Sequence, residues 1–408
     1  MKNKLRIAIV VSHPIQHFCP QYVSFSKCTD IQFKVFFASA IGFKKYVDAS
    51  FQQEISWDNL HLDKFDHCFL NGEQVIQSDK NLDAVSVEKR LDEYKPDVVI
   101  TYGYWQKLQR RVHRWALRNK VKIGFISDSE LRHQRNIVKD FIKGIFIRKY
   151  FSAIDFFLSA GESNEDYYKK YGVKTDKIIR MHLPIDIYQY EDAYKMRGIL
   201  RKQTRDTYLV KENEIVAIVV GKLVAWKNQD HIIEAMKLLE VKGIVMHLFI
   251  IGSGEMLEYV KHKAKDLKKS KVHFTGFINI EKLPAYYSAS DMYILPASIE
   301  PHSVAVSEAI YMGCPVIVSD RCGSYGFDDD VQEGKNGFVY KYNDIEELSN
   351  KIKIIIDDEN LRMRFSEYSH NISEKFQEKA HVTIIKDIKN RFPNKISKQN
   401  QISTSCDD

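Results

Sequence analysis

"MYILPASIEPHSVAVSEAIYMGCPVIVSD", residues 292–320, contains two short apolar runs, MYILP and CPVIVSD, joined by a segment with helical character. Ser303 is a good N-cap residue, and Gly313 is suited to end a helix that begins just after Ser303. Short continuous apolar runs are typical of buried strands in parallel sheets. The stretch therefore predicts a strand, a crossover helix and a second parallel strand.

The same alternation of short apolar runs and longer helical patterns covers most of the chain. The predicted strands of the first half are LRIAIVVS, FKVFFAS, DVVITYG, KIGFISD and IDFFLSAG. Those of the second half are EIVAIVVG, MHLFIIGSG, KVHFTGF, MYILPAS, PVIVSD and GFVYK. Strands that alternate with helices form parallel sheets covered on both faces. We therefore predict an α/β protein with two Rossmann-like, doubly wound domains that face each other across a cleft.

Changes in composition predict where these domains begin and end. Residues 1–190 are expected to form the N-terminal domain and residues 211–372 the C-terminal domain. Between them, residues 191–210 are polar, lack a strand pattern and are assigned to the interdomain connection. Residues 373–393 are predicted to form a helix that crosses back to the N-terminal domain. The polar tail, residues 394–408, has no apolar periodicity and is predicted to be disordered.

The overall composition is that of a soluble globular protein and favours the cytoplasm. The 408-residue chain is 44% hydrophobic and 28% charged, and no apolar run approaches the ~20 residues that span a bilayer. His13 and Gln16 interrupt the apolar N-terminal run, so we interpret that run as a buried strand rather than a signal peptide. The six cysteines show neither metal-ligand spacing nor a disulfide framework. The net charge of +7 leaves room for anionic ligands or membrane surfaces.

Two glutamates in the opening stretch lie where acidic residues are uncommon. Pro301 disfavours a helical conformation at Glu300, which places Glu300 in the loop, whereas Glu308 lies in the predicted helix. Both carboxylates are therefore expected at the carboxyl edge of the sheet, beside a helix N-terminus suited to phosphate or polar ligands. The alternative is a loop charge at Glu300 and a capping or salt-bridge residue at Glu308.

Other strand ends in the second half carry residues suited to phosphate. Gly221 and Lys222 follow one predicted strand, and Lys227 comes five residues after Lys222. Gly221 permits close backbone approach, and two lysines can neutralise a diphosphate, although a solvated pair is an equal alternative. Gly252 and Gly254 form another strand-to-helix turn, which alone indicates only a tight turn.

The order of these elements over residues 215–370 resembles the C-terminal domain of family 4 retaining glycosyltransferases of the GT-B fold. That family has a Gly-Arg/Lys turn with a lysine five residues on, a G-x-G turn and a glutamate pair with the same spacing. The N-terminal stretch "VVSHPIQHFCPQYVSF" is similar to the HPIQY-like opening of a bacterial branch of the family. The resemblance therefore covers nearly the whole chain except the tail.

The resemblance implies a nucleotide-sugar donor, held by the C-terminal domain, and an acceptor on the N-terminal side. It implies that Lys222 and Lys227 contact the diphosphate, that Glu300 binds the donor sugar and that Glu308 binds the ribose. The set of donor-binding residues that it implies also includes Gly221, Gly252, His302, Ser303 and Val304. Glu300, both lysines and Asp128 are the catalytic candidates.

Several positions depart from the family pattern. His302 and Ser303 replace a Trp-Gly or Phe-Gly pair, so the donor sugar remains open. SHPIQ replaces a Gly-Gly loop, which makes His13 and Gln16 acceptor-binding candidates, with His17 a weaker one. Glu130 joins them, because it follows a predicted strand at a place where the family has a polar active-site residue. Structural roles are the alternative for the histidines, and an N-cap with a solvated partner for Asp128 and Glu130.

No metal motif stands out at a strand end, and no cofactor other than the donor substrate is expected, so the predicted transfer is metal-independent. The predicted acceptor is a glycan or a polyprenyl-diphosphate-linked glycan of bacterial surface polysaccharide synthesis, such as O-antigen or capsule. Residues 105–122 hold seven Lys/Arg and no acid, with interspersed apolar residues, and residues 137–151 are also basic and apolar. These stretches indicate either peripheral contact at the inner face of the cytoplasmic membrane or core-packed helices with basic outer faces. No nucleic-acid-binding motif accompanies the charge.

Two alternatives to a hexosyl- or N-acetylhexosaminyl-transferase remain. A nucleotide-sugar epimerase can share the fold but uses different catalytic residues and needs no acceptor. A non-catalytic binding subunit would keep the fold alone, and the four matching Lys and Glu residues argue against it. Fold likeness cannot separate these alternatives, whereas product analysis can.

Overall fold

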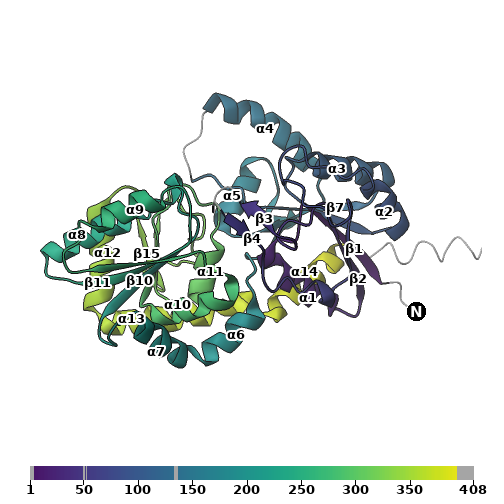
Figure 1. Ribbon diagram of the computed structural model, residues 1–408. Coiled ribbons are helices and arrows are strands. Elements are labelled where there is room, and N and C mark those ends of the chain that lie inside the picture. The colour runs from purple at the N-terminus through teal and green to yellow at the C-terminus, as the bar shows by residue number, and fades with distance from the viewer. Residues whose placement is uncertain (1–3, 49–50, 52, 133–136, 393–408) are drawn as a thin grey trace, which may run out of the picture.

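The computed structural model describes residues 4–48, 51, 53–132 and 137–392, and it contains two parallel sheets (Figure 1). The predicted disordered tail, residues 394–408, lies outside the described residues. The first sheet has seven strands in the order β5-β2-β1-β6-β7-β8-β9. Their bounds are His67–Phe69, Ile31–Phe37, Leu5–Val11, Val98–Tyr102, Lys122–Ser127, Phe156–Ser159 and Ile178–Arg180.

The second sheet has six strands in the order β12-β11-β10-β13-β14-β15. Their bounds are Lys271–Gly276, Met246–Ile251, Ile215–Val220, Met292–Leu295, Val316–Ser319 and Gly337–Tyr340. Every neighbouring pair in both sheets is parallel. The predicted α/β fold with two Rossmann-like halves is therefore confirmed.

Helices cover both sheets, as their apolar strands require. In the first half they are α1 Cys19–Ser26, α2 Val87–Tyr94, α3 Lys107–Asn119, α4 Ile137–Ser152 and α5 Glu162–Lys170. In the second half they are α8 Asp230–Val241, α9 Leu257–Ala264, α10 Leu283–Ala289, α11 Val304–Tyr311, α12 Ile345–Asp357 and α13 Glu359–Ile372. Among the described residues, no helix has the length and apolar character needed to cross a membrane.

Strand order fixes where a ligand crevice can form. In each sheet the chain first adds strands on one side and then returns to the other side of its first strand, beside β1 and beside β10. Loops on opposite faces of the sheet diverge at such a switch point, which leaves a crevice at the carboxyl ends. The loops after β1, β6, β10 and β13 therefore border the two crevices.

The segment predicted as an interdomain connection is helical. Helix α6, Ile187–Lys195, and helix α7, Arg197–Thr207, fill it, and α7 packs against α10 of the second half. Arg205 of α7 is buried, with 1% of its surface exposed. Its guanidinium donates to the Ala289 carbonyl (3.0 Å) and to Asp291 Oδ2 (2.8 Å). The segment is thus anchored on the second sheet.

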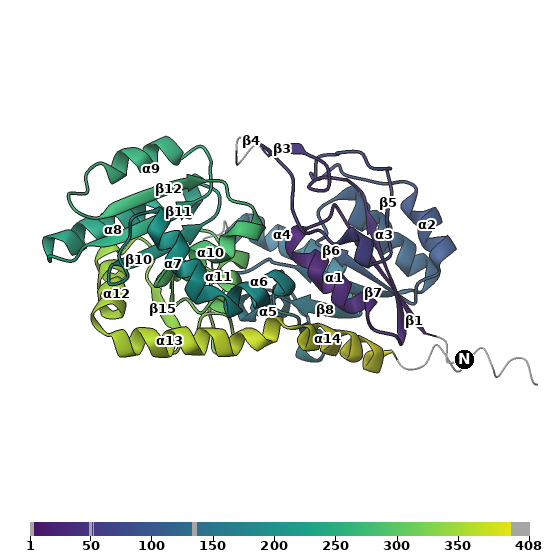
Figure 2. The same ribbon diagram turned by 60° about the horizontal axis from the view of Figure 1, so that its bottom comes forward.

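The chain crosses between the halves a second time near its end. After the short helix Ser373–Phe376, helix α14, Glu378–Arg391, lies along α1 of the first half (Figure 2). His381 and Ser24 Oγ are 3.1 Å apart, and Lys27 pairs with Glu378 at 2.7 Å. The chain thus returns to the first half through α14.

We predict that Arg205→Ala destabilises the protein by about 3 kcal/mol, because Asp291 loses its buried partner, although it keeps its pair with the partly exposed Arg201. Urea unfolding followed by circular dichroism measures the change. Lys202→Ala, on the same helix with a side chain 81% exposed, is the matched control. Equal losses in the two variants would contradict the anchoring role of Arg205.

Candidate active site

Two lysines follow β10 in the crevice of the second half. Gly221 adopts φ = +143°, which turns the chain directly after the strand. Lys222 comes next, and Lys227 ends the short helix Ala225–Lys227. The sequence-predicted lysine pair therefore lies at a carboxyl strand end beside the switch point.

Both ammonium groups contact carboxylates. Lys227 Nζ forms an ion pair with Glu300 Oε2, and both side chains are mostly buried. Lys222 Nζ lies 3.1 Å from Asp48 Oδ2 of the first half and 4.9 Å from the centre of the Phe51 ring. Each lysine is thus already held in place by an acid, and Lys222 links the two halves.

Glu308 lies in a different environment from Glu300. Its carboxylate is buried, and Tyr287 donates a hydrogen bond to it at 2.8 Å. Burial raises the pKa of Glu308 to about 7, although the Tyr287 hydroxyl partly opposes the shift. Of the two predicted glutamates, one therefore belongs to an ion pair and the other to a buried carboxyl site.

A small cavity of about 150 Å³ joins Glu308 to the glycine turns. Gly221, Gly252 and Gln16 line it together with Glu308. At Gly252, φ is +139° and an added Cβ would lie 1.9 Å from the Gly221 carbonyl oxygen, so only glycine fits there. Three aromatic side chains from both halves complete the wall: Phe51, Trp57 and Phe277. Glycine backbone and aromatic rings form a slot suited to a flat heterocycle.

The loop between β13 and α11 carries His302 and Ser303. His302 Nε2 lies 3.1 Å from Asp330 Oδ2, and Lys375 Nζ lies 2.9 Å from Asp330 Oδ1. Burial opposes charge on both His302 and Asp330, but their pairing raises the pKa of His302, and Lys375 and His302 together lower that of Asp330. The backbone N–H of Ser303 donates to Ser324 Oγ at 2.8 Å. Ser303 is predicted from the sequence to bind the donor substrate, but in this structure its amide is bonded within the protein.

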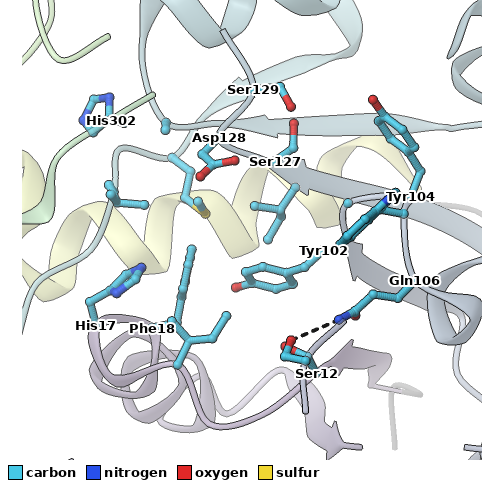
Figure 3. Close-up of a pocket in the computed structure, with 18 of the residues that line it drawn as sticks. Ser12, His17, Phe18, Tyr102, Tyr104, Gln106, Ser127, Asp128, Ser129 and His302 are labelled. Atoms are coloured by element: carbon cyan, nitrogen blue, oxygen red, sulfur yellow. Dashed lines mark hydrogen bonds between the residues drawn. The ribbon is translucent and has the colours of Figure 1, made fainter. Parts of the chain in front are cut away.

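A larger cavity of about 850 Å³ lies between the halves, mainly against the first (Figure 3). His302 and Val304 of the second half line one side of it. The carboxyl ends of β1, β6 and β7 and the segments after them supply most of the polar and aromatic wall, which includes Ser12, His17, Tyr102, Tyr104, Gln106, Ser127, Asp128 and Ser129. The cavity can therefore hold a polar molecule of sugar size or larger beside the α11 N-terminus.

Asp128 is the predicted catalytic candidate that faces this cavity. It follows β7, and its side chain is exposed to the cavity rather than packed in the core. Desolvation by the cavity walls raises the pKa of Asp128, while the nearby His302 charge lowers it. Asp128 and His302 thus approach the same space from opposite halves (Figure 3).

The structure places the predicted acceptor-binding residues apart. His13 does not line either cavity; its Nδ1 lies 2.9 Å from Ser12 Oγ, and burial lowers the pKa of His13 to about 4. Gln16 lines the small cavity and donates to the Asp58 carbonyl at 2.9 Å. Glu130 is buried and accepts from the Arg132 amide. His17, the weaker candidate, lines the large cavity instead.

Arg132 is a residue that sequence reasoning missed. It donates to the carbonyls of Cys322 (3.1 Å) and Tyr325 (2.6 Å), and its guanidinium lies 3.4 Å from the centre of the Tyr325 ring. It therefore fastens the loop after β7 to the second half. The sequence shows only an arginine two residues after Glu130. Its role could not be predicted, because its partners lie almost two hundred residues away.

One group of described residues has the donor atoms for a metal ion: His302, Asp329 and Asp330 lie with ligand atoms within 4.8 Å of one another. Lys375 already pairs with Asp330 in this group. In this structure the ammonium group of Lys375 thus balances negative charge of the buried carboxylates.

Two Rossmann-like halves with a crevice between their strand ends define the GT-B architecture, and solved GT-B structures share it. A glycosyltransferase from Rickettsia africae superposes with a TM-score of 0.70 at 16% identity, covering 96% of this chain and all of that one. Anabaena Alr3699/HepE in complex with UDP gives a TM-score of 0.66 at 16% identity and covers 95% of this chain. At these identities the likeness shows the fold.

Sequence comparison finds a family model that matches the second half. Residues 201–372 match the family model described as glycosyl transferases group 1. An uncharacterized glycosyltransferase of Haemophilus influenzae is 30% identical over 46% of this chain and 54% of its own length. The chain thus spans about half the length of the first curated relatives that it matches.

One relative extends into the first half. A UDP-Gal:alpha-D-GlcNAc-diphosphoundecaprenol alpha-1,3-galactosyltransferase of Escherichia coli is 26% identical over 77% of this chain and 80% of its own length. The chain therefore has the GT-B fold and is similar in sequence to glycosyltransferases. Membership of family 4 and the N-terminal motif stay predictions.

We predict that Glu308→Gln changes how stability depends on pH. The folded-state pKa of about 7 lies above the ordinary value of 4.5, so the native state keeps a proton that the unfolded chain releases as pH rises through this window. As pH rises from 4.5 to 7, Glu308 therefore lowers the free energy of unfolding of the wild type by up to about 3 kcal/mol. The amide side chain of Glu308→Gln does not titrate, so the variant avoids this loss.

Melting temperatures at pH 5 and pH 8 measure this effect. Relative to wild type, Glu308→Gln should be more stable at pH 8 than at pH 5. Glu346→Gln, an exposed carboxylate in the first turn of α12, is the control for losing one charge. A difference between Glu308→Gln and wild type that stays constant with pH would contradict a buried, protonated carboxyl.

Proposed function

We propose that this protein transfers a glycosyl group, with retention of configuration, from a nucleotide-sugar to a glycan or lipid-linked glycan acceptor. One observation carries the proposal: Lys222, Lys227, Glu300 and Glu308 gather at the crevice of the second half, and a cavity of about 850 Å³ adjoins it on the first. Donor and acceptor would then meet between the halves.

The donor is proposed to occupy the second half. The aromatic small cavity suits the base, and Glu308 at its edge suits the ribose hydroxyls. Lys222 and Lys227 would bind the diphosphate, which competes for them with Asp48 and Glu300. The UDP-sugar named for the Escherichia coli relative, and the UDP bound to Alr3699/HepE, make UDP-sugars the first donors to test.

The chemistry breaks the bond between the anomeric carbon and the phosphate oxygen and forms a bond to an acceptor hydroxyl. Negative charge develops on the departing nucleoside diphosphate, and Lys222 and Lys227 would stabilise it in the metal-independent transfer that we propose. Glu300, freed from Lys227 as the diphosphate binds, would bind hydroxyls of the transferred sugar. Asp128, with its raised pKa, faces the side from which an acceptor enters.

The acceptor is proposed to be a saccharide of bacterial surface polysaccharide synthesis, such as O-antigen or capsule, carried on a polyprenyl diphosphate. The Escherichia coli relative, whose name includes a diphosphoundecaprenol-linked sugar, supports this class. The large cavity joins apolar side chains such as Phe18 and Leu183 to polar ones, as a glycolipid end group requires. The proposed location is the cytoplasmic face of the inner membrane.

We predict that UDP-sugars raise the melting temperature of the wild-type protein, because ligand that binds only the native state stabilises it by mass action. Lys227→Ala should abolish this shift at the same ligand concentration and lower kcat/KM by about a hundredfold, as expected for loss of transition-state charge stabilisation. Lys269→Ala, an exposed lysine of the same half, is the control.

Product analysis completes the test. Released nucleoside diphosphate together with a new glycoside supports transfer, whereas an epimerised nucleotide-sugar without acceptor consumption would identify an epimerase. A ligand-induced shift without turnover in the presence of lipid-linked acceptors would instead favour a binding subunit. No shift with UDP-, GDP-, dTDP- or CMP-sugars would refute the donor site.

A further inference from the structure

The outer face of α4 exposes large apolar side chains to solvent. Ile142, Ile145 and Phe146 are 65%, 59% and 48% exposed, and their spacing places them together on one side of the helix. The opposite side, with Ile147 and Phe151, packs into the core of the first half. Core packing thus accounts for one side of α4 and leaves the other without a partner.

Positive charge surrounds this apolar strip. Lys143, Arg148 and Lys149 are all exposed, and within the described part of the chain none of them pairs with an acid. The carboxylate of Asp140 in the same helix is engaged by Lys170 (2.6 Å). The face therefore alternates apolar and cationic side chains without compensating negative charge.

A groove between α3 and α4 extends the same face. It encloses about 280 Å³ and is lined by Arg110, His113, Arg114, Phe146 and Tyr150. His113 stacks on Tyr150 with ring centres 4.3 Å apart, and burial lowers its pKa, so it lies in the groove as a neutral ring. Arg110 and Arg114 are exposed and have no acidic partner among the described residues.

Two guanidiniums one helical turn apart, above an aromatic floor, can bind a phosphate group. The other two arginines of α3 do have acidic partners. Arg111 pairs with Asp83 (2.6 Å), and Arg118 pairs with Glu88 (2.5 Å). The absence of such partners is thus confined to the part of α3 that borders α4. The groove and the apolar strip form one continuous patch, which we call the α3–α4 face.

The α3–α4 face adjoins the mouth of the large cavity. Lys143 of α4 lines that cavity, as does Trp105, which precedes α3 and is 61% exposed. Tyr104, whose ring centre lies 6.0 Å from Lys143 Nζ, lines the same cavity as Asp128 (Figure 3). A molecule held at the face therefore has a direct entrance to the proposed acceptor site.

We propose that the α3–α4 face docks on an anionic lipid surface, with Ile142, Ile145 and Phe146 among the headgroups and Arg110 and Arg114 on headgroup phosphates. Interleaved apolar and cationic side chains are the composition that binds such surfaces. A second copy of the chain fits poorly, because a symmetric contact would bring these cations opposite one another. The proposal rests on the proposed function only in that a lipid-linked acceptor would enter from this face.

Co-sedimentation of the full chain with vesicles tests the proposal. We predict stronger binding to phosphatidylcholine vesicles that contain phosphatidylglycerol than to phosphatidylcholine alone. Arg110→Gln/Arg114→Gln should weaken binding about thirtyfold, since each cation near an anionic surface contributes independently. Lys265→Gln/Lys269→Gln removes the same charge from exposed positions of the second half and should leave binding unchanged.

A second pair separates apolar insertion from charge alone. Ile145→Ser/Phe146→Ser should abolish the binding that persists at high salt, because screening removes only the electrostatic part. Equal binding to both vesicle types, or equal losses in the two charge variants, would overturn the proposal. So would a concentration-dependent dimer that these apolar substitutions dissolve, since the face would then join two copies.

The outcome is independent of donor binding. Each variant is first checked for its melting temperature and for its UDP-sugar-induced shift, which the α3–α4 face should not affect. Vesicle binding without any donor shift would refute the proposed function alone. A donor shift without vesicle binding would refute the docking surface alone.

Discussion

The buried carboxylate of Asp330 ties together the parts of the second half from which the chain returns to the first. An isolated carboxylate in a protein interior costs several kcal/mol, so its surroundings must supply charge and hydrogen bonds. Here His302 comes from the loop before α11, Ser307 from α11 itself and Lys375 from the segment before α14. One anion therefore fixes the cavity wall, a crossover helix and the return of the chain to the first half.

The loop that contains Asp330 also contacts the first half directly. Asp329 accepts from the Glu162 amide at 2.8 Å, and Glu162 in turn accepts from the amide of Asp328 at 2.7 Å. Arg132 adds its bonds to the same loop. Several polar contacts thus join the halves along one edge of the crevice, and the Asp48–Lys222 ion pair joins them along another.

Sequence reasoning predicted most of the strands, because buried parallel strands are continuous apolar runs. It missed the edge strands β5 and β9 and the antiparallel pair of β3, Tyr46–Asp48, and β4, Gln53–Ile55, because strands of three residues are too short to form a pattern. It also missed the helical character of residues 191–210, because α6 and α7 are largely polar surface helices. In residues 105–122 the apolar positions Leu108, Val112, Trp115 and Ala116 turned out to be core, which agrees with the alternative of a core-packed helix.

The sequence predicted those site residues that lie at the ends of predicted strands. It did not predict contacts between residues that are far apart in the chain. The lysines, glycines and glutamates could be found from strand ends, but their present partners could not: Asp48 lies 174 residues before Lys222. The different environments of Glu300 and Glu308 depend on side chains from other elements, Lys227 and Tyr287. The choice between His13 and His17 depended on the turn after β1, which directs only His17 into the large cavity.

Helix α14 has a mechanical consequence. The chain passes between the halves at two places, once before α6 and once before α14, and both passages lie on the same side of the molecule (Figure 2). Two adjacent covalent connections form a hinge between the halves. They oppose twisting and sliding and leave rotation about the line that joins them as the easiest relative movement. Rotation of this kind would widen or narrow the space between the two halves.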